Sequence, residues 1–273
     1  AKDLIARSDV VVENFGPGVM ERLGLGYEEL RGIKDDIILF SMPGAGLYGP
    51  MKDLRTYGLS LTSTTGLDSL VGYKGGDPIP VENAFSDPYA GILGAFAVLS
   101  ALNHRRNTGQ GQHIDFSQQE AVMQMVGPAY MDYVLNGRSG GPKSNEHPLA
   151  AMAPHGVFRC KGDDRWISIV VGSDEEWHSL LAALKHPEWL KVSEFATREQ
   201  RLAHIDTLHA LLGEWTVQFD DRELAALLQS HGVAATPVLN VGDLLGDPHY
   251  VARRTFIEVE HPLGFKETIY GSY

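Results

Sequence analysis

The sequence lacks the features that mark several classes of protein. It has a single cysteine, Cys160, so no disulfide can form within the chain and nothing indicates an oxidising compartment. Basic residues are scarce: 23 Lys and Arg against 35 Asp and Glu give a net charge of −12, which argues against general nucleic-acid binding. No apolar run reaches the roughly 18 residues of a membrane span, and the first ten residues lack a secretory hydrophobic region. We therefore expect a cytoplasmic protein with no nucleic-acid or membrane partner.

What is present is the composition of an ordinary globular protein, with 273 residues of which 43% are hydrophobic and 21% charged. Residues 9–13 and 36–41 are short apolar runs that predict two strands, and residues 19–23 and 27–33 between them fit two short helices. This strand–helix–strand order is typical of a parallel sheet with helical crossovers. Two long helices are predicted further on, over about residues 88–106 and 117–135.

The second half of the chain has a different pattern, separated from the first by a Gly-rich linker at residues 137–148. Residues 156–160 and 166–171 predict a hairpin, and residues 236–239 a further strand. Capping boxes that open helices are formed by Ser173 with Glu176 and by Thr197 with Gln200, and another helix is expected over residues 221–230. The sequence therefore predicts a large α/β unit over residues 1–140, a smaller α+β unit over residues 141–235, and a segment 236–273 that leaves the smaller unit.

Asp87 is the position that says most about chemistry. It precedes Pro88, and because proline favours the first helical position, Asp87 is predicted to be the N-cap of the long helix. The simplest interpretation is that Asp87 only caps this helix. A carboxylate at a helix N-terminus is also stabilised and oriented as an anion, which is what a carboxylate nucleophile needs. Local sequence alone leaves both interpretations open.

Longer motifs decide between them. The segment ENFGPGVMERLGL at residues 13–25 resembles the signature of the class III CoA-transferases of the CaiB/BaiF type, the family of formyl-CoA transferase, carnitine CoA-transferase and α-methylacyl-CoA racemase. Further matches follow in the family's order: the Gly-rich loop at residues 41–50, Asp87 before its Ala/Gly-rich helix, and residues 108–115, 232–238 and 247–254. Because these matches span nearly the whole chain, they favour Asp87 as the nucleophile.

The resemblance implies a fold and a reaction. The family's fold is α/β, with a large Rossmann-like parallel-sheet domain and a smaller α+β domain, and its chains form interlocked homodimers. In the family mechanism an aspartate, here Asp87, attacks an acyl-CoA thioester, forms an aspartyl-CoA intermediate, and passes CoA to a free carboxylic acid. Acyl-CoA and coenzyme A are thus substrates, and no tightly bound cofactor or metal is expected. The 11 histidines and one cysteine form no cluster with the spacing of metal ligands.

The resemblance also assigns the other site residues. Asn14, Phe15 and Leu23 fall in the motif that contacts CoA, with Arg22 near the phosphates of the cofactor. Arg55 and Tyr57 match positions near the nucleotide and the acyl group, and Tyr57 is a candidate hydrogen-bond donor to a substrate carboxylate. From position alone, Phe15 is equally well interpreted as a core aromatic and Arg22 as a solvated helix residue. Lys52 and the basic run at residues 104–106 are interpreted as solvated charges and are left out of the predicted site.

Two departures from the family pattern bear on the reaction. The racemase branch has a histidine at the position of Tyr57, and without that basic partner proton transfer at a substrate α-carbon is hard to support. An acyl-CoA racemase or epimerase therefore remains the alternative if the protein is an enzyme. If it is not an enzyme, the alternative is a catalytically silent CoA-binding protein. The formyl-CoA branch has a glycine run over the site, where residues 149–153 here have none, which argues against a very small oxalate-like substrate.

The ends of the chain also differ from the family pattern. Compared with the family, the chain begins after the first strand–turn–helix units and stops at Tyr273, before the segment expected to return to the large domain. We therefore expect the isolated 273 residues to lack part of the CoA site and to be weakly active or inactive.

Overall fold

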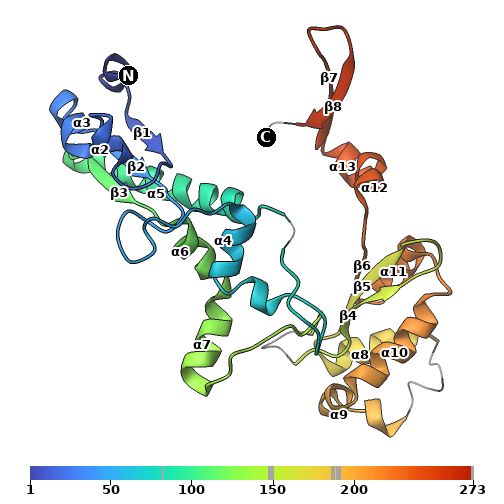
Figure 1. Ribbon diagram of the computed structural model, residues 1–273. Helices are drawn as coiled ribbons and strands as arrows, with labels where there is room; N and C mark the ends of the chain where they lie inside the picture. Colours follow the sequence, from blue (N-terminus) through green and yellow to red (C-terminus); the bar gives the residue numbers. More distant parts are fainter. Residues whose placement is uncertain (82, 147–150, 186–187, 189–191, 272–273) are drawn as a thin grey trace. The chain divides into compact units, whose positions relative to one another are not determined.

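The computed structural model describes the chain apart from residues 82, 147–150, 186–187, 189–191 and 272–273. The described residues form two compact units, residues 1–144 and residues 145–273 (Figure 1). Each unit has its own sheet and its own buried core, so each is described by itself.

A three-stranded parallel sheet forms the centre of the first unit. Its strands are β1 (Val10–Glu13), β2 (Ile38–Ser41) and β3 (Gln112–Asp115), in that order. Helices α2 (Val19–Arg22) and α3 (Tyr27–Ile33) connect β1 to β2, while α4 (Gly58–Thr64), the 3-10 turn η1 (Asp68–Leu70) and α5 (Ser86–Thr108) lie between β2 and β3. A short helix, α1 (Lys2–Ile5), precedes the sheet. The predicted α/β class and the parallel sheet are confirmed.

The central strand β2 is buried on both faces, as strands of parallel sheets are. Leu39 packs with Met20 and Leu30 on the face covered by α2 and α3. Phe40 points to the other face, where α5 crosses so closely that a Cβ on Gly94 would lie 2.7 Å from the Phe40 ring. The sheet is therefore held between helices on both sides, which fixes the strand ends and the loops that follow them.

Helix α5 (Ser86–Thr108) begins two residues earlier than the start predicted from Pro88. Phe85 already has helical backbone angles, Ser86 is the first helical residue, and the first helical hydrogen bond runs from Tyr89 N–H to the Phe85 carbonyl. The prediction that Asp87 is the N-cap is therefore wrong: Asp87 lies inside the first turn. Pro88 is tolerated there because its amide position falls among the first four of the helix, which have no helical acceptor.

The predicted second long helix is interrupted. Residues 117–135 instead form α6 (Gln118–Met123), a 3-10 turn η2 (Gln124–Val126) and α7 (Gly127–Asn136). The break coincides with Gly127 and Pro128, where glycine weakens the helix and proline cannot donate the hydrogen bond that a continuous helix needs.

The second unit is built on an antiparallel sheet of β4 (His155–Arg159), β5 (Trp166–Val170) and β6 (Ala234–Pro237). Its helices are α8 (Asp174–Ala183), α9 (Arg198–Ala203), α10 (Ile205–Thr216) and α11 (Asp221–Ser230), with a 3-10 turn η4 (Ser193–Phe195). Thr197 and Gln200 form the predicted capping box, whereas Glu176 accepts from the Gly172 amide, so only half of the Ser173 box forms. The hairpin and the α+β character are confirmed.

The end of the chain continues from β6 into α12 (Val241–Gly246), α13 (Pro248–Ala252) and a hairpin of β7 (Phe256–Glu260) and β8 (Lys266–Tyr270). Two ion pairs tie α12 and α13 to the antiparallel sheet and its helices: Arg165 to Asp243 at 2.8 Å and Arg222 to Asp247 at 3.2 Å. Return of residues 236–273 to a larger domain stays a prediction.

The cysteine lies in the core of the second unit. Cys160 is fully buried at the end of β4. Burial raises the pKa of the Cys160 thiol to about 11, and the carboxylates of Asp221 and Asp220 add to this effect. Because the thiolate is the reactive form of cysteine, Cys160 is not a nucleophile at neutral pH.

Arg201 joins several segments of the second unit although it is only 1% exposed. Its guanidinium donates to the Ala153 carbonyl at 3.1 Å, the Phe195 carbonyl at 3.3 Å and the Asp174 carboxylate at 2.7 Å. The same group lies 4.7 Å from the centre of the Trp177 ring, within the range of a cation–π contact.

Replacing Arg201 with methionine is expected to lower the free energy of unfolding by about 2–4 kcal/mol, because buried carbonyls lose their donors. Urea unfolding followed by tryptophan fluorescence measures this change. Arg198→Met is the matched control, since Arg198 lies on the same helix but is exposed and pairs with the exposed Glu199 at 3.5 Å. Equal midpoints for the two variants would contradict the role given to Arg201.

Candidate active site

The ends of the parallel strands surround a cleft of about 1020 Å³ in the first unit. Asn14 follows β1, Met42 follows β2, and Gln118 opens the helix that follows β3; all three line the cleft. The remaining lining comes from α2 and the turn before it, Pro43 and Gly44 after β2, the loop from Lys52 to Gly58, Leu61 of α4, and Asp87. The cleft therefore lies at the carboxyl edge of an open α/β sheet, where ligands of such folds usually bind.

Asp87 reaches the cleft from the first turn of α5. The preceding residue, Ser86, is fully buried and its hydroxyl donates to the Gly58 carbonyl at 2.9 Å, which fixes the start of α5 against the start of α4. Asp87 itself is exposed, and its carboxylate has no hydrogen bond or ion pair within the part of the chain that the structure describes. A fixed backbone thus presents a free carboxylate, close to a helix N-terminus that favours negative charge.

The turn after β1 is held by a buried acid. Glu13 is 8% exposed, and its carboxylate accepts from the Phe15 amide at 2.8 Å while its carbonyl accepts from the Met42 amide at 2.9 Å. This holds Asn14 and Phe15 at the cleft. Phe15 is 48% exposed and lines the cleft, so its interpretation as a core aromatic is wrong.

The Gly-rich loop after β2 is tied to the end of β3. The Leu47 amide donates to the Asp115 carboxylate at 2.9 Å, and the Gln118 side chain donates to the Met42 carbonyl at 2.7 Å. The Gln119 amide adds a bond to the Gly44 carbonyl at 2.9 Å. These bonds order the cleft wall that follows β2 and β3, and none of them involves the Asp87 carboxylate.

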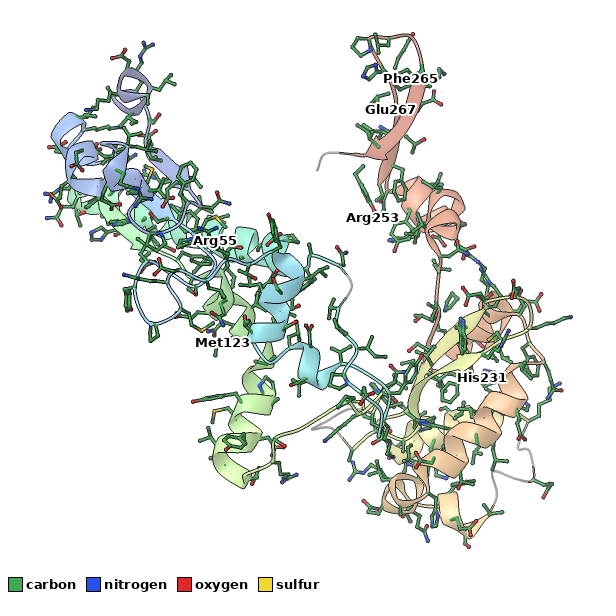
Figure 2. All side chains as sticks on the ribbon, in the orientation of Figure 1. Arg55, Met123, His231, Arg253, Phe265 and Glu267 are labelled. Atoms are coloured by element: carbon green, nitrogen blue, oxygen red, sulfur yellow. The ribbon has the colours of Figure 1, made fainter. Side chains whose placement is uncertain are left out.

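Three cations line the cleft: Arg22, Lys52 and Arg55. Figure 2 shows Arg55 on the loop that leads into α4. None of the three has an acidic partner among the described residues, although the chain as a whole carries a net charge of −12. The acids of the lining are Asp53 and Asp87. Unpaired cations gathered in an acidic protein indicate a site for an anionic ligand.

The other predicted residues divide between the cleft and the surface. Tyr57 lines the cleft with 90% of its surface exposed, and its amide donates to the Ser60 hydroxyl at 3.1 Å at the start of α4. Leu23 is 59% exposed and lies outside the lining. The structure thus brings together six of the seven predicted residues: Asp87, Asn14, Phe15, Arg22, Arg55 and Tyr57.

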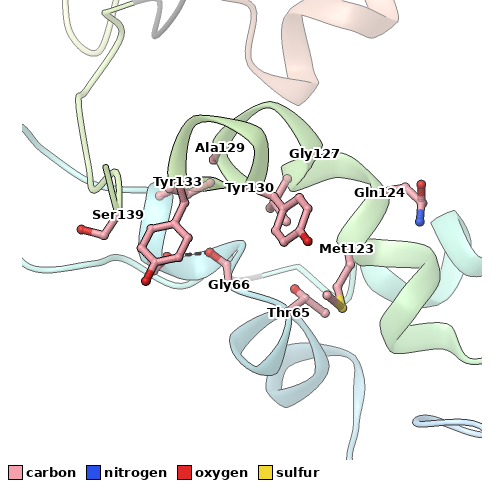
Figure 3. A pocket seen from close by; sticks show the side chains of 12 residues that line it. Thr65, Gly66, Met123, Gln124, Gly127, Ala129, Tyr130, Tyr133 and Ser139 are labelled. Carbon is pink, nitrogen blue, oxygen red and sulfur yellow. Dashed lines mark hydrogen bonds between the residues drawn. The ribbon is translucent and has the colours of Figure 1, made fainter. Parts of the chain in front are cut away.

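A second cavity, of about 500 Å³, lies between α4 with η1 and the helices after β3. Figure 3 shows Tyr130 and Tyr133 of α7 opposite Thr65 and Gly66. None of the described residues that line this cavity carries a charge. It therefore does not suit a polyanionic ligand, and the larger cleft is the candidate site.

The described part of the chain lacks two other kinds of functional feature. Over those residues no group of three or more His, Cys, Asp or Glu side chains is arranged to hold a metal ion. Within the same residues no helix combines the length and apolar character needed to cross a bilayer. Residues 149–153 stand where the formyl-CoA branch is expected to have its glycine run. Positions 149 and 150 of this segment lie outside the described residues.

Comparison with known proteins identifies the family. The family model described as CoA-transferase family III matches residues 1–269 of the 273. The chain belongs to CoA-transferase family III. The family resemblance carried by the motifs at residues 13–25 and 41–50 is thereby confirmed.

Relatives of this family III chain include several proteins named CoA-transferases. It is 32% identical over 263 residues to the succinyl-CoA–L-malate CoA-transferase beta subunit of Chloroflexus aurantiacus, covering 95% of this chain and 64% of that protein. It is 31% identical over 269 residues to the succinyl-CoA:mesaconate CoA-transferase of Haloarcula marismortui, covering 95% and 65%. A CaiB/BaiF family protein from Brucella suis has a similar structure, with a TM-score of 0.85, 32% identity, and coverage of 97% of this chain and 68% of that one. The chain thus spans about 64% of the length of the first two relatives.

Sequence reasoning missed some residues of this family III cleft. Lys52 was interpreted as a solvated charge but lines the cleft, and Asp53 and Gln118 were not singled out. A usable signal was the position of Lys52 directly after the Gly-rich loop. By contrast, Arg105 of the basic run at residues 104–106 forms an ion pair with Asp9 at 2.9 Å, so this member of the run has a structural role.

Proposed function

We propose that the protein transfers CoA from an acyl-CoA thioester to a free carboxylic acid, with Asp87 as the covalent nucleophile. The observation that carries this proposal is the Asp87 carboxylate in a cleft with three cations, all four without a charged partner among the residues that the structure describes. Membership of CoA-transferase family III and the names of the relatives support the same reaction class.

The chemistry consists of acyl transfers that begin and end with the Asp87 carboxylate. An Asp87 oxygen attacks the thioester carbonyl carbon, the C–S bond breaks, and its electron pair leaves with the CoA thiolate. The thiolate then attacks the aspartyl carbonyl of the resulting anhydride, which releases the donor acid as a carboxylate and leaves an aspartyl-CoA thioester. An acceptor carboxylate repeats these two steps in reverse and regenerates Asp87. No net proton or electron is transferred, so each step needs a positioned nucleophile rather than an acid–base pair.

The cleft supplies binding groups for a CoA thioester. Arg22, Lys52 and Arg55 are suited to the phosphates of CoA, because charge-assisted hydrogen bonds are the strongest contacts to such groups. Asn14 and Phe15 provide an amide and an aromatic face at the same wall, and Tyr57 offers a hydroxyl to a substrate carboxylate. CoA and its thioesters act here as substrates.

Dicarboxylic acids are the first substrates to test. The relatives are named for succinyl-CoA with malate, citramalate or mesaconate. We therefore propose succinyl-CoA as a donor and four- or five-carbon dicarboxylates as acceptors. An exchange assay on the complete protein that carries this chain, which follows the new acyl-CoA by chromatography, tests the proposal. If that protein passes CoA to none of the acceptor acids, the proposal is refuted.

Proton transfer at the α-carbon is not supported by the cleft. None of the described residues that line it is a histidine. The family resemblance places Tyr57 at the position where the racemase branch has one. Deuterium uptake from D₂O at the α-carbon, without any acceptor acid, would instead indicate a racemase or epimerase.

We also propose a homodimer in the cytoplasm. Helix α5 carries an exposed apolar stripe of Ile92, Phe96 and Leu99, which are 69%, 71% and 65% exposed. This i, i+4, i+7 spacing is typical of a helix face that packs against another surface. Light scattering of the complete protein that carries this chain is expected to give twice the mass of one subunit, and a monomer at micromolar concentration would refute the dimer.

A further inference from the structure

The residue facing Asp87 is a glycine that has no room for a side chain. Gly58 is buried at the start of α4 and lines the cleft. A Cβ placed on Gly58 would lie 3.1 Å from Asp87 Oδ2, 2.9 Å from the Ala84 Cβ and 3.1 Å from the Ala84 Cα. Any other residue at position 58 would therefore press on the carboxylate and on the backbone before α5.

The backbone itself does not require glycine at this position. Gly58 does not have the positive φ that excludes other residues, in contrast to Gly66 at the end of the same helix, where φ is +83°. Alanine in a helix is favoured over glycine by about 0.5–1 kcal/mol. The absence of a side chain at position 58 is thus explained by the lack of space beside Asp87 and Ala84.

The surroundings of Gly58 cannot easily move apart. The buried Ser86 hydroxyl donates to the Gly58 carbonyl at 2.9 Å and joins the first residues of α4 and α5. Asp87, the next residue along, is held by the same helix turn. An added methyl group would therefore be met by displacement of the carboxylate rather than by separation of the helices.

We propose that Gly58 is a positioning residue for Asp87, whose missing side chain keeps Oδ2 open to the reacting acyl carbon. The inference rests on the proposed function, in which an Asp87 oxygen must come within about 3–3.5 Å of the thioester carbon. A methyl group 3.1 Å from Oδ2 lies at the same distance from that oxygen and so reduces the space open to an approaching carbon. The effect falls on formation of the acyl-aspartyl bond, because the cations that serve CoA lie on other residues.

Three variants of the complete protein that carries this chain test the inference. Gly58→Ala adds the methyl group, and Gly58→Ala with Ala84→Gly removes its closest contact, the Ala84 Cβ, so that folding is relieved while the contact with Oδ2 remains. Gly91→Ala is the matched control, since Gly91 is an exposed glycine of α5 with nothing within 4 Å of its added Cβ. Each protein is checked by thermal unfolding, by calorimetry with CoA, and by mass spectrometry of the Asp87 adduct after rapid mixing with succinyl-CoA.

The double variant is expected to unfold near the wild-type temperature and to bind CoA with wild-type affinity, but to form the adduct about 100-fold more slowly, as misplacement of a reacting group by about 1 Å does. Gly91→Ala is expected to match the wild type in all three measurements. A folded double variant that forms the adduct at the wild-type rate would overturn the role of Gly58 and leave the proposed function standing. A wild-type protein that forms no adduct on Asp87 would overturn both.

Discussion

Replacing Asp87 with asparagine is expected to abolish CoA exchange while the fold and the binding of CoA are retained. Asparagine has nearly the same size and shape as aspartate, so the contacts around Ser86 and Gly58 stay in place. Its amide is not a nucleophile, and removal of a nucleophile that forms a covalent intermediate lowers kcat by at least about 10³-fold. In the complete protein that carries this chain, the exchange assay with succinyl-CoA and a dicarboxylate measures the loss, and calorimetry measures CoA binding.

Asp53→Asn is the matched control for this prediction. Asp53 lines the same cleft, so its replacement removes the same charge from the same surroundings. Exchange that survives in Asp53→Asn but not in Asp87→Asn identifies the nucleophile rather than a general electrostatic effect. An Asp87→Asn protein that exchanges CoA at the wild-type rate would rule out the covalent role.

Combined replacement of Arg22, Lys52 and Arg55 with alanine is expected to weaken CoA binding by roughly 100-fold, at about 1 kcal/mol for each lost contact between exposed charges. The three side chains have no acidic partner among the described residues, so their removal leaves no carboxylate stranded. Binding by the wild type should weaken as salt is added, because exposed charges are screened. The triple variant should show a much flatter salt dependence.

Lys2→Ala with Arg7→Ala and Arg106→Ala is the matched control for the three cations. These residues are exposed and lie outside the cleft, and their removal changes the net charge by the same amount, from −12 to −15. Equal loss of CoA affinity in both triple variants would show that overall charge, and not the cleft, determines binding.

Much of the fold follows from local signals in the sequence. The apolar runs at β1 and β2, the turn between β4 and β5, and the Thr197 capping box each depend on neighbouring residues, and each forms as predicted. Helix ends were harder: the start of α5 is set by the bond from Ser86 to Gly58, residues 28 positions apart, which no local pattern shows. The break at Pro128 has a local signal, the Gly127-Pro128 pair. The apolar pattern around this pair nevertheless predicted one continuous helix.

The cleft likewise has some residues that the sequence predicts and others that only the folded chain reveals. Family motifs placed Asp87, Asn14 and Arg22 in one predicted site, and the structure lines one cleft with all three. Lys52 could not be distinguished from other surface lysines, because its importance depends on the folding of the loop before α4. The crowding between Gly58 and Asp87 is likewise invisible in sequence, since it depends on two helix starts meeting in space.

The central claim is that Asp87 carries CoA as a covalent thioester during turnover. The most direct test is mass spectrometry of peptides from the complete protein that carries this chain, quenched during exchange between succinyl-CoA and a dicarboxylate. We predict a CoA adduct on the peptide that contains Asp87, present only with acyl-CoA, converted by hydroxylamine to a hydroxamate, and absent from Asp87→Asn. A protein that exchanges CoA actively without this adduct, or with an adduct on another residue, would contradict the claim.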